Sequence, residues 1–190
     1  FSLCRKAGGR TAAISYSWMS ELYSRAPYVS DRDRVQLDAE GSIQYGMYYW
    51  DDNYPDSHVF AEGECLRKTF EPDFMLYHTM AVDEWGHMKG ADSAEYANAV
   101  AAVGHLIAAR MPEWLEKGYQ VVVTADHGMN NLGIHVGTEY AQREVALYIF
   151  SDKVENGRFE ENYISQLNVA PMVCRLMGVP ATEGMKQELE

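Results

Sequence analysis

Residues 119–137, YQVVVTADHGMNNLGIHVG, decide the fold class and point to the chemistry. The run Val121–Thr124 is short, apolar and β-branched, which predicts a strand buried on both faces, as in a parallel sheet. Two potential metal ligands, Asp126 and His127, follow this run, and His135 comes after a loop rich in glycine and asparagine. Because α/β folds bind ligands at the carboxyl ends of parallel strands, we expect these side chains at such an edge.

The preceding stretch supplies the other half of a βαβ unit. Asp73–Met80 predicts a strand, and a long amphipathic helix follows it until Pro112, which should end, kink or restart that helix. Strand, helix and strand in this order predict a right-handed crossover between parallel strands. The first of these strands runs into Asp83 and His87, so two successive strands each end in Asp plus His.

Shorter patterns along the chain complete an α/β architecture. We expect strands at Arg10–Ser15 and Glu144–Phe150, and helices at Tyr16–Arg25, Ser57–Phe70 and Asn168–Met177. The polar segment Ala26–Gln44 predicts a loop with a solvated charged face. The aromatic segment Tyr45–Asp56 predicts a loop packed on the core, with a substrate-facing patch as the alternative. Together these segments predict a mostly parallel sheet with helices on both faces, in a single domain over residues 1–190.

Composition limits the function classes. The formal net charge of −12 disfavours binding to duplex nucleic acid or to an anionic membrane, because the long-range field repels phosphate. A small phosphorylated substrate stays compatible if metal ions supply local positive charge. No apolar run has the length of a membrane span. The three cysteines lack metal-ligand spacing, so we expect buried or free thiols, which favours a reducing, cytoplasmic compartment.

The candidate metal ligands combine carboxylate and imidazole groups. Such mixed donors suit Zn²⁺ and, less strictly, Mn²⁺ or Fe²⁺. Five ligands exceed what one open tetrahedral ion needs, so they fit two ions about 4 Å apart, as in phosphoryl-transfer sites. Taken singly, each Asp–His pair has a simpler interpretation, as a chance spacing or a turn cap. The five candidate ligands are Asp83, His87, Asp126, His127 and His135.

The other polar residues near these motifs receive structural interpretations. His58 and His105 fall on predicted helices, and His78 falls inside a predicted strand, so we expect none of the three to bind metal. Glu84 and Lys89 flank the first ligand pair and could touch substrate, although their spacing does not require it.

The motifs DEWGH at 83–87, TADHGM at 124–129 and HVG at 135–137 together resemble the alkaline phosphatase superfamily. Within it, the nearest branch is the type I phosphodiesterase / nucleotide pyrophosphatase group. The resemblance implies a three-layer sandwich and two zinc ions. Asp83, His87 and His135 would hold one ion, and Asp126 and His127 would hold part of the other.

The family's nucleophilic Thr or Ser, and one further Asp ligand, have no match in this sequence. Thr11 lies at a strand start in the wrong context for the nucleophile. The resemblance therefore implies the C-terminal portion of a catalytic domain, incomplete at its N-terminus, which binds metal but turns over little substrate alone. In the complete enzyme the missing hydroxyl would attack phosphorus in line and form a covalent phospho-enzyme.

The substrate class stays open at this stage. Phosphodiester or nucleotide pyrophosphate hydrolysis is the first hypothesis, on a small phosphorylated substrate. Phosphomonoesterase, sulfatase and phosphosugar mutase reactions occur in the same superfamily, and a metal-binding module without turnover is the alternative from another class. Metal content and an activity panel would separate them.

Overall fold

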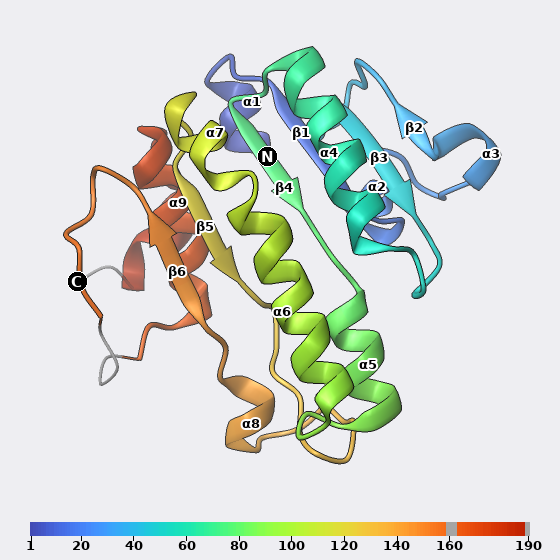
Figure 1. Cartoon of the computed structure of the whole chain (residues 1–190). Helices are drawn as coiled ribbons and strands as arrows, with labels where there is room; N and C mark the ends of the chain where they lie inside the picture. Colours follow the sequence, from blue (N-terminus) through green and yellow to red (C-terminus); the bar gives the residue numbers. More distant parts are fainter. Residues whose placement is uncertain (159–162, 189–190) are drawn as a thin grey trace. The chain divides into compact units, whose positions relative to one another are not determined.

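The computed structural model describes residues 1–158 and 163–188, which divide into two compact units. The first unit contains Phe1–Leu106 together with Asn131–Gly133. The second contains Ile107–Asn130 and the described residues from Ile134 onward. Strands and helices alternate through much of the chain (Figure 1), as an α/β fold requires. Within the described ranges, no helix combines the length and the apolar character needed to cross a lipid bilayer.

A four-stranded, mostly parallel sheet forms the centre of the first unit. Its strand order is β2 (Val35–Gln36), β3 (Tyr45–Tyr49), β1 (Thr11–Tyr16) and β4 (Phe74–Tyr77). Strand β1 pairs in parallel with both β3 and β4, and β2 pairs antiparallel with β3. This arrangement confirms the predicted mostly parallel sheet.

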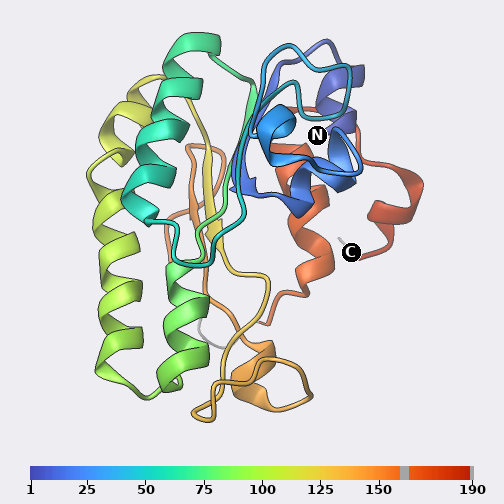
Figure 2. The same cartoon turned by 90° about the vertical axis from the view of Figure 1, so that its right-hand side faces the viewer.

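Strand β1 is central and fully buried, from Thr11 to Ser15. Helix α4 (Asp56–Phe70) packs against β1, β3 and β4, and α2 (Trp18–Tyr23) contacts β1 and β3. Figure 2 shows these two helices on opposite sides of the strands. The first unit therefore has helices on both faces of its sheet. For this reason consecutive residues of β1 are all buried, instead of alternating between buried and exposed.

Helix α4 follows from its sequence pattern and from one close contact. Its buried residues Val59, Phe60 and Leu66 form one stripe of the helix. At Gly63 an added Cβ would collide with the ring of Tyr77 on β4. The absence of a side chain at Gly63 thus lets α4 approach the sheet closely.

Residues 45–49 of the aromatic segment form strand β3, so the prediction of a loop was wrong there, whereas residues 50–55 are a loop as predicted. Tyr48 and Tyr49 of β3 are 0% and 1% exposed. Tyr48 belongs to a core cluster with Ala13 and Ile43, and Tyr49 to a second cluster that includes Ile14. Pairing with β1 buries both tyrosines, and that pairing is a tertiary contact that local sequence does not reveal.

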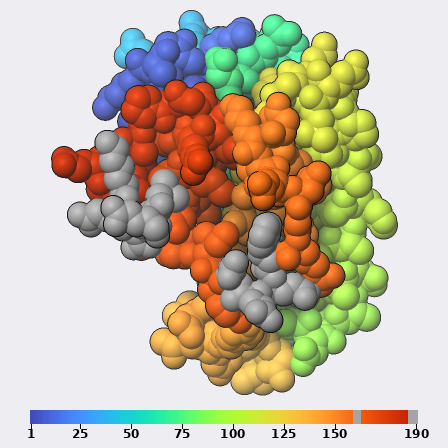
Figure 3. All heavy atoms as spheres, turned by 90° about the vertical axis from the view of Figure 1, so that its left-hand side faces the viewer, coloured from blue at the N-terminus to red at the C-terminus, as the bar shows by residue number. Residues whose placement is uncertain are grey.

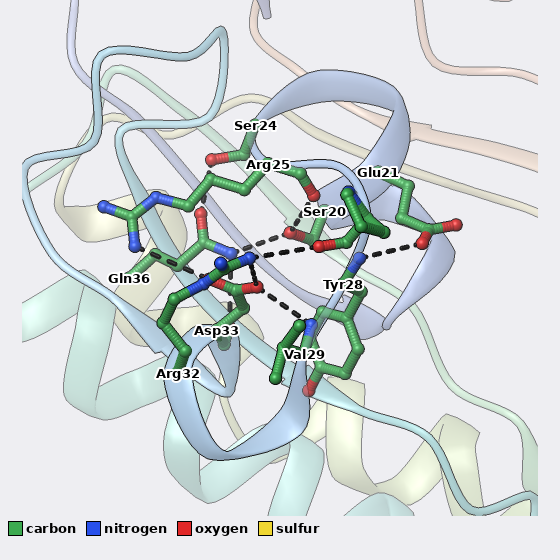
Figure 4. A network of polar contacts seen from close by, with 10 residues as sticks. Ser20, Glu21, Ser24, Arg25, Tyr28, Val29, Arg32, Asp33 and Gln36 are labelled. Atoms are coloured by element: carbon green, nitrogen blue, oxygen red, sulfur yellow. Dashed lines mark hydrogen bonds and ion pairs between the residues drawn. The ribbon is translucent and has the colours of Figure 1, made fainter.

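The polar segment 26–44 is mostly irregular and at least partly exposed, as predicted, but it is not a loop throughout. It contains β2 and the short helix α3 (Ser30–Asp33), which surround a buried carboxylate (Figure 4). Asp33 accepts hydrogen bonds from the Nε and Nη2 of Arg32 at 2.8 and 2.6 Å and from the backbone N–H of Val29 at 2.9 Å. The Arg25 guanidinium lies 3.5 Å from the same carboxylate. Buried charges in proteins are paired in this way because an isolated one is costly.

The remaining helices of the first unit are α1 (Ser2–Lys6), α5 (Ala81–Lys89) and α6 (Ala94–Ala108), the last of which ends in the second unit. Figures 1 and 2 show α5 and α6 side by side, joined by a short turn. Helix α7 (Met111–Glu116) begins with Pro112 in its first turn, so the helical path restarts there, which was one of the predicted outcomes.

In the second unit, β5 (Val121–Thr124) pairs antiparallel with β6 (Leu147–Phe150). Helices α8 (Tyr140–Arg143) and α9 (Val169–Met177) follow β5 and β6 in turn, with 3₁₀ turns η1 (Gln166–Asn168) and η2 (Glu183–Glu188) beside α9. Figure 3 shows the face of this unit where β6, in orange, lies beside the C-terminal helical segment, in red. The strand at Val121 and the helix ending at Gly178 are confirmed. However, β5 is only partly buried, pairs antiparallel, and belongs to a different sheet from β4. The predictions of a strand buried on both faces and of a parallel crossover from β4 to β5 were therefore wrong.

Candidate metal centre

Asp83 and His87 lie one turn apart on α5, so their predicted position at a strand end was wrong. Residues 78–80 separate β4 from this helix. The i, i+4 spacing brings the Nε2 of His87 to 3.4 Å from the Oδ2 of Asp83. Two ligand atoms bound to one tetrahedral Zn²⁺ at about 2.0–2.1 Å are separated by about 3.3–3.4 Å. The pair therefore already has the spacing of two ligands on one zinc ion.

A backbone carbonyl fixes the tautomer of His87. Its Nδ1 lies 2.8 Å from the carbonyl oxygen of Gly133. A carbonyl can only accept a hydrogen bond, so Nδ1 carries the proton and the neutral ring has its lone pair on Nε2. Gly133 adopts φ +74°, and a Cβ there would lie 2.7 Å from the carbonyl oxygen of His87. Both the left-handed backbone and the close approach favour glycine at this position.

The second unit presents its own ligand group directly after β5. The Nε2 of His127 lies 3.7 Å from the Oδ2 of Asp126, and its Nδ1 lies 3.0 Å from the carbonyl oxygen of Gly128. The rings of His127 and His135 stack with centroids 3.8 Å apart and planes 13° apart. Each ring offers a nitrogen ligand atom within 4.8 Å of the other's. Within this unit His127 therefore lies close both to Asp126 and to His135.

The loop that carries His135 is held by residues that sequence reasoning missed. Asn130, 6% exposed, accepts from the Ile134 N–H through Oδ1 at 2.9 Å and donates through Nδ2 to Glu139 at 3.0 Å. Gln142 donates to the carbonyl oxygens of Ile134 and Val136, and it forms a capping box with Glu139 at the start of α8. The Glu-x-x-Gln spacing is a recognisable helix-start signal and could have indicated this support.

The structure also places the other histidines and the two residues that flank the Asp83–His87 pair. His58 and His105 are exposed residues on α4 and α6, as predicted. His78 lies one residue beyond β4 instead of inside it, and its carbonyl oxygen accepts a hydrogen bond from the Tyr49 hydroxyl at 2.8 Å. Glu84 is half-buried on α5, and Lys89 is exposed at its end.

The donors present fit a divalent transition metal. Each unit offers carboxylate oxygen and imidazole nitrogen, the set that zinc and, less selectively, manganese accept. His87 and His127 both have a carbonyl acceptor at Nδ1, the kind of supporting hydrogen bond that orients metal-binding histidines. All three cysteines are free thiols, and Cys4 and Cys174 are buried. Their positions in the sequence do not have the short spacing of cysteine ligands in zinc sites.

Comparisons with known proteins agree with the motifs. The curated relatives include GPI ethanolamine phosphate transferase 3, catalytic subunit, of Mus musculus, 27% identical over 157 residues, or 78% of this chain and 14% of the relative. GPI ethanolamine phosphate transferase 3 of Saccharomyces cerevisiae is 26% identical over 182 residues, or 86% of this chain and 16% of the relative. The chain therefore spans less than a fifth of the length of these relatives.

Among solved structures, an inactive variant of murine ectonucleotide pyrophosphatase / phosphodiesterase 5 in complex with AMP matches with a TM-score of 0.46. It is 19% identical in sequence, and the match covers 67% of this chain and 31% of that one. The family model for type I phosphodiesterase / nucleotide pyrophosphatase matches residues 5–169, which is most of the sequence. The resemblance seen in the motifs is thereby confirmed, and the chain belongs to the type I phosphodiesterase / nucleotide pyrophosphatase family.

Proposed function

We propose that these 190 residues carry the metal ligands of a phosphodiester-cleaving enzyme. The observation that supports this most strongly is the same arrangement in both units. In each unit a histidine, His87 or His127, has its Nδ1 within hydrogen-bond distance of a backbone carbonyl oxygen. Its Nε2 lies near an aspartate oxygen, at 3.4 Å for His87 and 3.7 Å for His127. Family membership supports phosphoester chemistry as the use of such ligands.

Zinc is the metal that we propose, with Asp83, His87 and His135 on one ion and Asp126 and His127 on the other. When bound, zinc would act as a Lewis acid on phosphoryl oxygens and lower the pKa of a coordinated oxygen nucleophile. The protein's own contribution is orientation: the carbonyls of Gly133 and Gly128 hold two of the imidazoles in the metal-binding tautomer.

We assign the nucleophile to no residue of this chain. The hydroxyl of Thr11 is fully buried, donates to the carbonyl oxygen of Ser42 at 2.7 Å and accepts from the Gln44 N–H at 3.0 Å. These two hydrogen bonds give Thr11 a structural role in the sheet. We therefore propose metal binding for these residues, and turnover for a longer protein that supplies the attacking hydroxyl.

A second reaction has specific support. The relatives named above are GPI ethanolamine phosphate transferases, and a transferase passes its group to an acceptor other than water. Both reactions break one P–O bond and form another, and the same metal ligands serve either one. Transfer of a phosphoethanolamine group is thus the alternative to hydrolysis, and the identity of the acceptor separates them.

Zinc titration of the metal-stripped 190-residue chain tests the proposal. Isothermal calorimetry with D83N and H127Q should show at least about tenfold weaker binding for each variant. H105Q is the matched control, because His105 is an exposed histidine on α6, and it should bind zinc like the parent chain. If the parent binds no zinc, or if H105Q weakens binding as much as the two site variants, the ligand assignment is wrong.

A reaction assay of a full-length protein containing this chain then distinguishes the alternatives. Release of nitrophenol from a nitrophenyl phosphodiester supports hydrolysis, whereas phosphoethanolamine incorporation into an added alcohol acceptor supports transfer. Zinc binding without either reaction, and without phosphomonoesterase or sulfatase activity, would leave a binding module.

A further inference from the structure

Helix α5, which carries Asp83 and His87, receives its N-terminal cap from another part of the chain. The residue before the helix, Met80, makes no side-chain capping bond. Instead the Oδ1 of Asp56 accepts from the Met80 N–H at 3.2 Å and lies 3.5 Å from the backbone nitrogen of Ala81. The first N–H groups of a helix have no partner inside it, so a carboxylate here satisfies two of them.

Asp56 is suited to hold this position rigidly. It is the first residue of α4, which packs against the sheet, and only 8% of its surface is exposed. Burial raises the pKa of Asp56, and the two N–H contacts oppose that rise. Its negative charge also lies at the positive end of the α5 dipole, where a carboxylate is favourable.

A second contact fixes the chain just before α5. The hydroxyl of Tyr49, at the end of β3, donates to the carbonyl oxygen of His78 at 2.8 Å. The N–H of His78 in turn donates to Ile14 of β1 at 2.9 Å. The link between β4 and α5 is therefore held at residue 78 by the sheet and at residues 80–81 by Asp56.

These contacts determine where the ligand pair lies. Asp83 is two residues beyond Ala81, in the first turn of α5, and its 3.4 Å spacing from His87 depends on that turn being formed. Building on the metal site proposed above, we propose that Asp56 is a positioning residue for the Asp83–His87 ligand pair. It acts through the N-terminus of α5, where its carboxylate meets the backbone N–H groups of Met80 and Ala81.

The test combines hydrogen exchange of the metal-free chain with zinc titration. D56A should speed exchange of the amides of residues 80–84 about fivefold, the factor expected from loss of a typical helix cap. It should also weaken zinc binding about tenfold, as loss of supporting contacts does at other metal sites. D56N keeps an acceptor oxygen, so it should restore exchange to within about twofold of the parent.

Asp73 provides a matched control. Its carboxylate accepts from the backbone N–H of Arg10 at 2.8 Å, a bond of the same kind at the start of β1. D73A should change neither α5 exchange nor zinc affinity. If D56A proves unfolded in buffer, D56A and the parent chain are compared in an osmolyte such as TMAO, which favours the folded state.

The outcomes separate the two proposals. Parent-like exchange at residues 80–84 in folded D56A overturns the positioning role, and so does an equal effect of D73A. Failure of D56N to restore exchange overturns it as well. If the parent chain binds no zinc, the metal proposal fails, while the exchange measurements still decide whether Asp56 orders α5.

Discussion

Replacing Asn130 by alanine should destabilise the loop that carries His135. Asn130 is buried, and its side chain makes one hydrogen bond with the Ile134 N–H and one with the Glu139 carboxylate. A neutral bond contributes about 0.5–1.5 kcal/mol and a bond to a charged group about 1.5–3 kcal/mol. Because Glu139 is exposed, water can replace the second bond, so the sum falls toward the lower end, about 2 kcal/mol.

Urea denaturation followed by circular dichroism measures this change in the free energy of unfolding. The matched control is N53A, because Asn53 is exposed in a turn and its replacement should change stability by less than about 0.5 kcal/mol. Zinc binding to N130A should weaken about tenfold, since His135 follows Ile134 directly. A loss below about 0.5 kcal/mol with parent-like zinc affinity would show that Asn130 does not hold this loop.

Three further predictions concern other parts of the molecule. The bond from Arg32 lowers the pKa of Asp33 from 3.8 to about 2. Because the folded-state pKa is below the unfolded one, the ionised carboxylate stabilises the folded protein above pH 3.8, and this stability should be lost as the pH drops from about 4 to about 2. Acid titration followed by circular dichroism should show a weaker loss in D33N. G128A should lose about 1–3 kcal/mol in urea denaturation, because its Cβ would collide with the backbone of Ala141; a tolerated substitution would contradict the described turn. Cys65 is the exposed thiol, so a thiol reagent should label one cysteine rapidly in the native protein and three after denaturation; rapid labelling of all three would contradict the described burial.

The apolar runs predicted most of the strands and helices correctly. Residues 56–70 form an amphipathic helix because hydrophobic periodicity records which face is buried. The continuous apolar run Val121–Thr124 is a strand, although it is partly buried and antiparallel rather than fully buried and parallel. The clearest failure is strand β3, which is ordered by pairing with β1, a partner distant in sequence.

The candidate site shows the same division. Residue types and spacing identified the Asp and His groups, and the structure brings Asp83 to His87 and places His127 against His135. Their helical setting on α5 was not predicted, because that nine-residue helix contains Gly86 and takes its cap from Asp56, 25 residues before Ala81. Such support from another segment is invisible to a local reading of the sequence.

X-ray absorption at the zinc edge of the zinc-loaded chain tests the central claim most directly. Aspartate and histidine ligation predicts nitrogen and oxygen neighbours at about 2.0–2.1 Å, with the outer-shell scattering of imidazole. A sulfur neighbour at about 2.3 Å would place the metal on a cysteine. That result, or a spectrum without imidazole scattering, would contradict metal binding by these aspartate and histidine side chains.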